Sequence, residues 1–147
     1  MMNAVQLEIT PQETNLSFLS NKITLPIGSD SINGFKFQHS PITPYEAEIA
    51  IELIENTVIP ARKQLSINNP VLINRDNKLK AIWQHTGNTE YFLTTQQIES
   101  AFNELVNVIN GSPINSTTLP TDTSFTAFLI IIRELTHHWE LDGIYLK

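Results

Sequence analysis

The N-terminal part of the chain alternates between hydrophobic and polar positions over short distances. Apolar residues occupy every second position in residues 4–9 and again in residues 22–27, which predicts two short strands. Asn33-Gly34 favours a hairpin turn, because both residues tolerate positive φ. Phe35 and Phe37 follow on one apolar face. The first forty residues are therefore expected to form a small β region of two to four strands.

Two later stretches have helical spacing and clear start signals. Thr43 and Glu46 match a capping box, and the apolar stripe that follows predicts a helix that Pro60 kinks or ends. Thr94 and Gln97 repeat the capping pattern, and Gly111 is suited to end that second helix. The first helix also carries Glu48, Glu52 and Glu55 on the face opposite the apolar stripe, where we expect solvent rather than a metal ion.

Residues 69–94 lie between these helices and have a strand-like pattern. Three short apolar runs, 71–73, 79–83 and 91–93, are separated by polar, turn-forming segments around residues 75–78 and 85–88. This arrangement predicts a three-stranded antiparallel meander.

The segment from Asp122 to Lys147 is the most apolar part of the chain. Asp122 can cap a helix whose broad face of Phe, Leu, Ile and Trp side chains predicts the central packing element. Residues 129–132 are apolar without interruption, which indicates a helix covered on more than one side. Gly143 should break this helix, and residues 144–146 should form a terminal strand.

The order of elements favours an α+β fold. Strands and helices are partly segregated along the sequence, so we predict a single domain, residues 1–147, with a mainly antiparallel sheet packed against about three helices. The alternative is an α/β fold built of two similar halves.

Composition narrows the possible functions. A hydrophobic content of 41% is typical of a globular protein, and the absence of cysteine excludes disulfides and thiolate sites. The net charge of −6 argues against nucleic-acid binding. No stretch reaches the roughly 20 apolar residues that cross a bilayer, and the N-terminal residues lack a signal-peptide pattern, so we expect a cytoplasmic protein.

Basic residues are concentrated in the middle of the chain. Arg62, Lys63, Arg75, Lys78 and Lys80 lie between two acidic ends. The favoured interpretation is internal charge pairing in the folded protein, and the alternative is a patch that meets an acidic partner.

The densest group of chemically capable side chains lies near the end of the final helix. Glu134 precedes His137 by three residues and His138 by four, so either histidine can lie beside the carboxylate on a helix. Such a pair can bind a metal ion or orient a histidine base. The favoured interpretation is an ordinary polar helix end on the solvent side. His39 and His85 fall in expected loops and should be surface histidines.

These patterns lead to two functional hypotheses. The preferred one is a small cytoplasmic binding, adaptor or regulatory protein that acts through a surface, performs no chemistry and needs no cofactor. Self-association as a homodimer, or contact with a protein partner, would suit it. The alternative is a metal- or histidine-dependent hydrolase that uses Glu134, His137 and His138. The phosphate-binding and nucleophile motifs G-x-G-x-x-G, G-K-S/T and G-x-S-x-G are all absent from the sequence.

Overall fold

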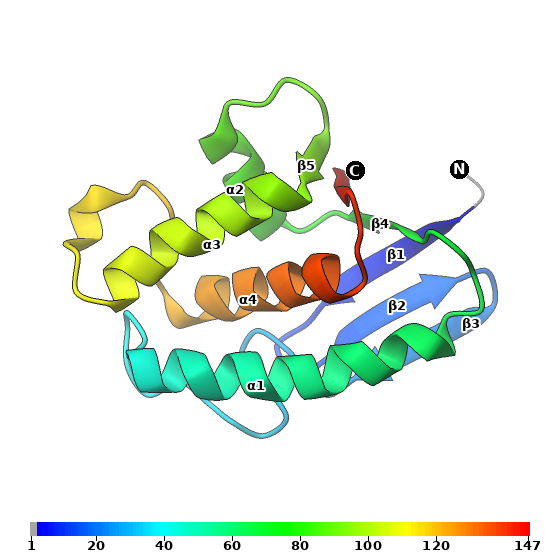
Figure 1. Cartoon of the computed structure of the whole chain (residues 1–147), viewed down its shortest axis with the longest axis horizontal. Helices are drawn as coiled ribbons and strands as arrows, with labels where there is room; N and C mark the ends of the chain where they lie inside the picture. Colours follow the sequence, from blue (N-terminus) through cyan, green and yellow to red (C-terminus); the bar gives the residue numbers. More distant parts are fainter. Residues whose placement is uncertain (1–2) are drawn as a thin grey trace.

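The computed structural model describes residues 3–147 and contains one six-stranded sheet (Figure 1). Its strands are β1 (Ala4–Ile9), β2 (Thr14–Phe18), β3 (Asn21–Leu25), β4 (Val71–Asn74), β5 (Phe92–Thr94) and β6 (Gly143–Leu146), in the spatial order β3-β2-β1-β4-β6-β5. The pairs β1–β2, β2–β3 and β5–β6 are antiparallel, whereas β1–β4 and β4–β6 are parallel. The sheet is therefore mixed, and the prediction of a mainly antiparallel sheet is wrong.

Four α-helices accompany the sheet within the described residues. They are α1 (Pro44–Ala61), α2 (Asn77–Thr86), α3 (Thr95–Ile109) and α4 (Thr123–His138), with 3-10 turns η1 (Arg62–Gln64) and η2 (Ile114–Ser116). Both predicted capping boxes form, at Thr43–Glu46 and at Thr94–Gln97. Pro60 lies in the last turn of α1, so the helix ends beside it at Ala61, as expected. None of these helices is long and apolar enough to span a membrane.

The parallel pairing follows from a helix that the sequence pattern concealed. Residues 79–83, predicted as a strand, belong to α2, which Asp76 caps by accepting a hydrogen bond from the Lys78 amide. Leu79 and Ile82 are the buried residues of α2, and their spacing of three suits a helix. Because β4 is followed by this helix, it cannot form a tight hairpin with the next strand. It pairs instead with β1 and β6, which it reaches through long crossovers.

Three helices cover one face of the sheet and enclose the core. In Figure 1, α1, α4 and α3 lie side by side in front of the strands, with α4 in the middle. Residues 125–132 of α4 are all buried, which confirms the predicted central element. On the covered face one apolar row crosses the sheet through Leu93, Ile144, Leu72 and Val5. The sheet and helices share this core, so the chain forms a single small α+β domain.

Candidate functional site

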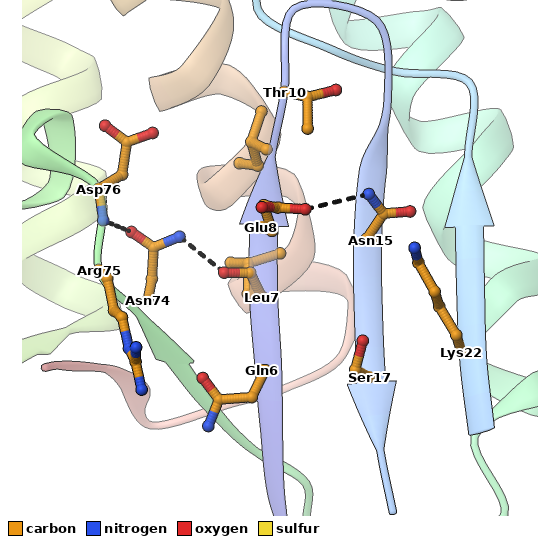
Figure 2. A pocket seen from close by; sticks show the side chains of 11 residues that line it. Gln6, Leu7, Glu8, Thr10, Asn15, Ser17, Lys22, Asn74, Arg75 and Asp76 are labelled. Atoms are coloured by element: carbon orange, nitrogen blue, oxygen red, sulfur yellow. Dashed lines mark hydrogen bonds between the residues drawn. The ribbon is translucent and has the colours of Figure 1, made fainter. Parts of the chain in front are cut away.

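A large depression lies at the carboxyl ends of the parallel strands β1 and β4. It has a volume of about 720 Å³ (Figure 2). Such ends are the usual ligand sites of sheets with parallel strands, because the chain leaves the sheet there and side chains converge. The polar side chains that line it belong to Gln6, Glu8, Thr10, Asn15, Ser17, Lys22, Asn74, Arg75 and Asp76.

The strand alternation of β1 directs Glu8 away from the helices and into this depression. Its neighbours Leu7 and Ile9 are buried in the core, whereas Glu8 is exposed on the other face. Asn15, directly opposite on β2, donates its side-chain amide to Glu8 Oε1 at 3.3 Å. Thr24 on β3 in turn donates its hydroxyl to Asn15 Oδ1 at 2.8 Å. Asn15 therefore orients one oxygen of the exposed Glu8 carboxylate on the open face of the sheet.

The other wall of the depression is the segment in which β4 turns into α2. Asn74 is buried and donates its side-chain amide to the Leu7 carbonyl at 2.9 Å, and its Oδ1 accepts the Asp76 amide at 2.9 Å. These bonds, drawn in Figure 2, join the ends of β1 and β4. Asp76 is committed to capping α2, which leaves Arg75 between them as the free charged side chain of this wall.

The depression can accept an anion. Within residues 3–147, neither Arg75 nor Lys22 forms an ion pair with a carboxylate. A second depression of about 410 Å³ shares Asn74, Arg75 and Asp76 with the first and adds Lys80 and Lys147. Lys22 and Arg75 therefore line the first depression, and Arg75, Lys80 and Lys147 line the second. The expected internal pairing of the basic segment is seen only for Lys78 with Asp76, at 3.9 Å, in the described chain.

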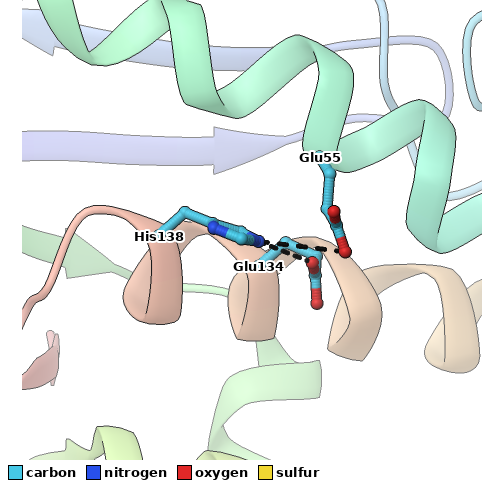
Figure 3. A group of neighbouring side chains, drawn as sticks. All are labelled: Glu55, Glu134 and His138. Atoms are coloured by element: carbon cyan, nitrogen blue, oxygen red, sulfur yellow. Dashed lines mark hydrogen bonds and ion pairs between the residues drawn. The ribbon is translucent and has the colours of Figure 1, made fainter.

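The residues proposed from the sequence lie elsewhere, between α1 and α4. Figure 3 shows that Glu134 and His138 converge with Glu55 of α1. Glu134 Oε1 is 3.2 Å from His138 Nε2, and Glu55 Oε1 is 3.9 Å from that nitrogen. His137 is exposed and meets only the edge of the His138 ring, with centroids 4.9 Å apart. The structure therefore brings together two of the three candidates and adds Glu55, which the sequence pattern had assigned to solvent.

Glu134 is fully buried, so its expected position on the solvent face is wrong. Helix α3 packs against that side of α4 and places Glu99 beside Arg133. Arg133 donates Nε and Nη2 to the Glu99 carboxylate at 2.8 and 3.0 Å, and Nη1 to Glu134. Burial raises the pKa of Glu134, Arg133 opposes that rise, and the nearby Glu55 carboxylate adds to it.

The other two histidines form separate pairs. His39 Nδ1 lies 3.0 Å from Glu46 Oε1 at the start of α1, and His85 Nε2 lies 2.8 Å from Glu104 Oε2 of α3. Neither approaches His138 within hydrogen-bonding distance in the described chain. The depression residues Glu8 and Arg75 were missed from the sequence because each looks like an ordinary polar position in a strand or turn. The available signal was that both lie at the carboxyl ends of strands, but it required the parallel pairing to be known.

Comparisons with known proteins identify the fold. No protein-family model matches the sequence, and no curated protein does. Among solved structures, the Aquifex aeolicus Ppx/GppA phosphatase, type II variant, is similar with a TM-score of 0.75 at 15% identity, over 98% of this chain and 52% of that one. An exopolyphosphatase from Cytophaga hutchinsonii gives 0.68 at 14% identity, over 98% and 52%. An exopolyphosphatase-like protein gives 0.68 at 9%, over 99% and 54%.

These similarities establish a shared fold, and this chain spans about half the length of the structures it matches. They also correct the preferred functional hypothesis. Proteins of this fold among the matches are phosphatases, so the expectation of an adaptor that performs no chemistry is overturned. The hydrolase alternative agrees better with the structural neighbours.

Proposed function

We propose that this chain is a phosphatase-like hydrolase that binds a phosphate chain or phosphate ester at the carboxyl ends of β1 and β4. The observation that carries the proposal is that Glu8 of β1 and Arg75, which directly follows the parallel strand β4, line one depression. A cation beside a carboxylate is the minimum needed to hold a phosphoryl group and activate water next to it. The similarity to exopolyphosphatases supports the same substrate class.

The row of cations favours a linear polyphosphate over a single phosphate group. Lys22 and Arg75 line the larger depression, while Lys80 and Lys147 line the adjoining one. Successive phosphates of a chain would bind successive cations across the two adjoining depressions. Arg75 belongs to both hollows, and its planar guanidinium is suited to binding two oxygens of one phosphoryl group.

In the proposed reaction a water molecule attacks the terminal phosphorus and the bridging P–O bond breaks. Glu8 accepts the proton of the attacking water, and the shortened chain leaves with the bridging oxygen. Arg75 and Lys22 stabilise the negative charge on the transferred phosphoryl oxygens. Asn15 keeps the Glu8 carboxylate in position through its amide hydrogen bond.

The test is phosphate release from tripolyphosphate and from long-chain polyphosphate by the purified chain. Glu8→Gln should abolish release and keep binding, because the amide preserves shape and removes the base. Glu48→Gln, an exposed position on α1, is the matched control and should behave like the unchanged protein. Equal release by Glu8→Gln and the unchanged chain would refute the assignment of Glu8. Failure of the unchanged chain to bind tripolyphosphate would refute the site itself.

The proposal also includes a second protein chain, either another copy of this one or a different partner. The structural neighbours are about twice as long as this chain, so self-association as a homodimer, or contact with a protein partner, would match their size. Light scattering with and without tripolyphosphate measures this directly. A species of monomer mass that hydrolyses polyphosphate would show that no second unit is needed.

A further inference from the structure

Glu55, Glu134 and His138 form a group of metal-ligating side chains that the proposed phosphate site does not use. Each offers one ligand atom, and the three atoms lie within 4.8 Å of one another (Figure 3). They come from two helices: Glu134 and His138 share one face of α4 at a spacing of four, and Glu55 reaches them from α1. The group therefore forms only where the two helices pack together, because no single helix carries all three residues.

The spacing of these atoms suits a small divalent ion. Ligands about 2.0–2.1 Å from a tetrahedral Zn²⁺ are roughly 3.3 Å apart. Glu134 Oε1 and His138 Nε2 are already at 3.2 Å. Glu55 Oε1 is 3.9 Å from the same nitrogen, and its side chain is 37% exposed, so it has room to move closer to an ion.

Neighbouring residues orient the buried Glu134 carboxylate toward the other two side chains. Arg133 donates a hydrogen bond to Oε2 of Glu134, which leaves Oε1 near His138 and Glu55. A hydrogen-bonded second oxygen is the usual support of a metal-binding carboxylate. The Trp139 indole donates to the Val58 carbonyl at 2.8 Å, one turn beyond Glu55, and fixes α4 against α1 at this position. Ligand positions on packed helices are better defined than on loops.

A cation near Glu55 and Glu134 would favour the ionised form of both carboxylates. Arg133 pairs with both Glu99 and Glu134, whereas among the described residues Glu55 has only His138 as a partner, at 3.9 Å. His138 is 23% exposed and Glu55 37% exposed, so an ion can enter from solvent between the helices.

We propose that Glu55, Glu134 and His138 bind one divalent transition-metal ion of the Zn²⁺ type, which links α1 to α4. An imidazole with two carboxylates suits Zn²⁺ or Mn²⁺, whereas Mg²⁺ prefers oxygen ligands alone. Three protein ligands leave a further coordination position for water. Helix α4 ends at His138 just before β6 begins at Gly143, so the ion lies near the amino ends of the strands. The proposed phosphate site lies at their carboxyl ends, and the two proposals are independent.

The experiment is a titration of chelator-treated, dialysed protein with Zn²⁺, followed by calorimetry and by thermal unfolding, without any phosphate substrate. The unchanged chain should bind one ion per chain, and its melting temperature should rise. Glu55→Gln should weaken binding by about tenfold or more and remove most of the thermal shift, because it replaces an anionic ligand by a neutral one of the same shape.

Two further variants distinguish an ion held by these three side chains from an ion bound elsewhere on the surface. His138→Ala should lose binding, and His137→Ala is the matched control, because His137 is exposed and lies outside the group of three ligands, so its loss should leave binding unchanged. Should His138→Ala fail to fold, Glu55→Gln alone decides the matter. Absence of stoichiometric Zn²⁺ binding by the unchanged chain, equal binding by Glu55→Gln, or equal loss in His137→Ala would each overturn the proposal.

Discussion

The Asn74 side chain donates its amide to the backbone carbonyl of Leu7, 67 residues earlier in the chain, at 2.9 Å. The paired residues of β1 and β4 end at Gln6 and Ile73, so this bond continues the connection where the backbone ladder stops. The same side chain accepts the Asp76 amide and thereby orients the turn that carries Arg75. Asn74 thus joins the two walls of the depression.

Replacing Asn74 should loosen this junction. In Asn74→Ala the Leu7 carbonyl and the Asp76 amide both lose their partner in a buried place, which should cost about 1–3 kcal/mol in the free energy of unfolding. Urea denaturation measures the loss. Asn77→Ala, an exposed position three residues later, is the control and should change stability little. Equal stability of Asn74→Ala and the unchanged chain would contradict a structural role for the side chain.

Gly28 packs closely against the backbone of the β1–β2 turn. A side-chain carbon at this position would lie 2.5 Å from the carbonyl carbon and oxygen of Pro11, which is closer than atoms pack. The next two residues hold the turn directly: the Ser29 amide donates to Thr10 O and the Asp30 amide to Pro11 O, both at 2.9 Å. The close approach of the two segments therefore depends on glycine.

We expect Gly28→Ala to destabilise the protein by about 1–3 kcal/mol, because the added methyl group forces the turn away. The measurement is the urea midpoint. Gly34→Asn serves as a control for loss of a glycine in general, since Gly34 has a φ of 89°, open space around it, and a turn conformation that Asn tolerates. A comparable loss in both variants would show that crowding against Pro11 is not the cause.

Glu46 should make stability depend on pH in the acid range. Burial tends to raise the pKa of its carboxyl, but hydrogen bonds from the Gln38 and Thr43 amides and from His39 outweigh burial, so the pKa is lowered from 4.5. A lowered pKa means that the ionised group stabilises the folded state above about pH 4.5, and that this stability is lost as the pH falls through the folded-state pKa.

Glu46→Gln should therefore lower the free energy of unfolding by about 2 kcal/mol near neutral pH and by much less in acid. Thermal unfolding of both proteins across this range shows whether the difference shrinks below about pH 4.5. The exposed Glu52 on the same helix provides the control, Glu52→Gln. A difference that stays constant with pH would mean that the charge of Glu46 is not what stabilises the folded state.

The local elements were largely predictable because their signals lie within a few residues. The strand at residues 4–9, the two capping boxes and the buried final helix all follow from short-range patterns that the structure confirms. The segment 79–83 was misassigned because a short apolar run fits either a strand or a helix. That one error concealed the crossover after β4 and with it the parallel pairing of β1, β4 and β6.

The candidate sites were less predictable, since each depends on long-range packing. Glu134 and His138 could be found by their helical spacing, but Glu55 is 79 residues before Glu134 and joins them only because α1 packs beside α4. Glu134 was placed on the solvent side because nothing local reveals that α4 lies between α1 and α3, where Arg133 and Glu55 lie near its carboxylate. That Glu8 and Arg75 line one depression could be seen only once the strand order was known. Sequence spacing identifies pairs on one element, whereas a site between elements requires the topology.

Arg75 should account for much of the affinity for phosphate chains. In Arg75→Ala, binding of tripolyphosphate should weaken by about tenfold at low salt, because a guanidinium that can contact two phosphate oxygens is lost. Arg75→Lys should be intermediate, since it keeps the charge without the planar geometry. The difference should diminish as salt is raised, because the site is open to solvent and ions screen it. Calorimetry at two salt concentrations measures each effect.

Lys63→Ala is the matched control for Arg75→Ala, because Lys63 is exposed on η1 and lies outside both depressions at the strand ends. The two variants remove the same net charge, so a general electrostatic attraction would weaken binding equally in both. A specific site requires that Arg75→Ala lose affinity while Lys63→Ala does not. Equal effects would place the anion elsewhere on the surface and leave Glu8 without a substrate to act on.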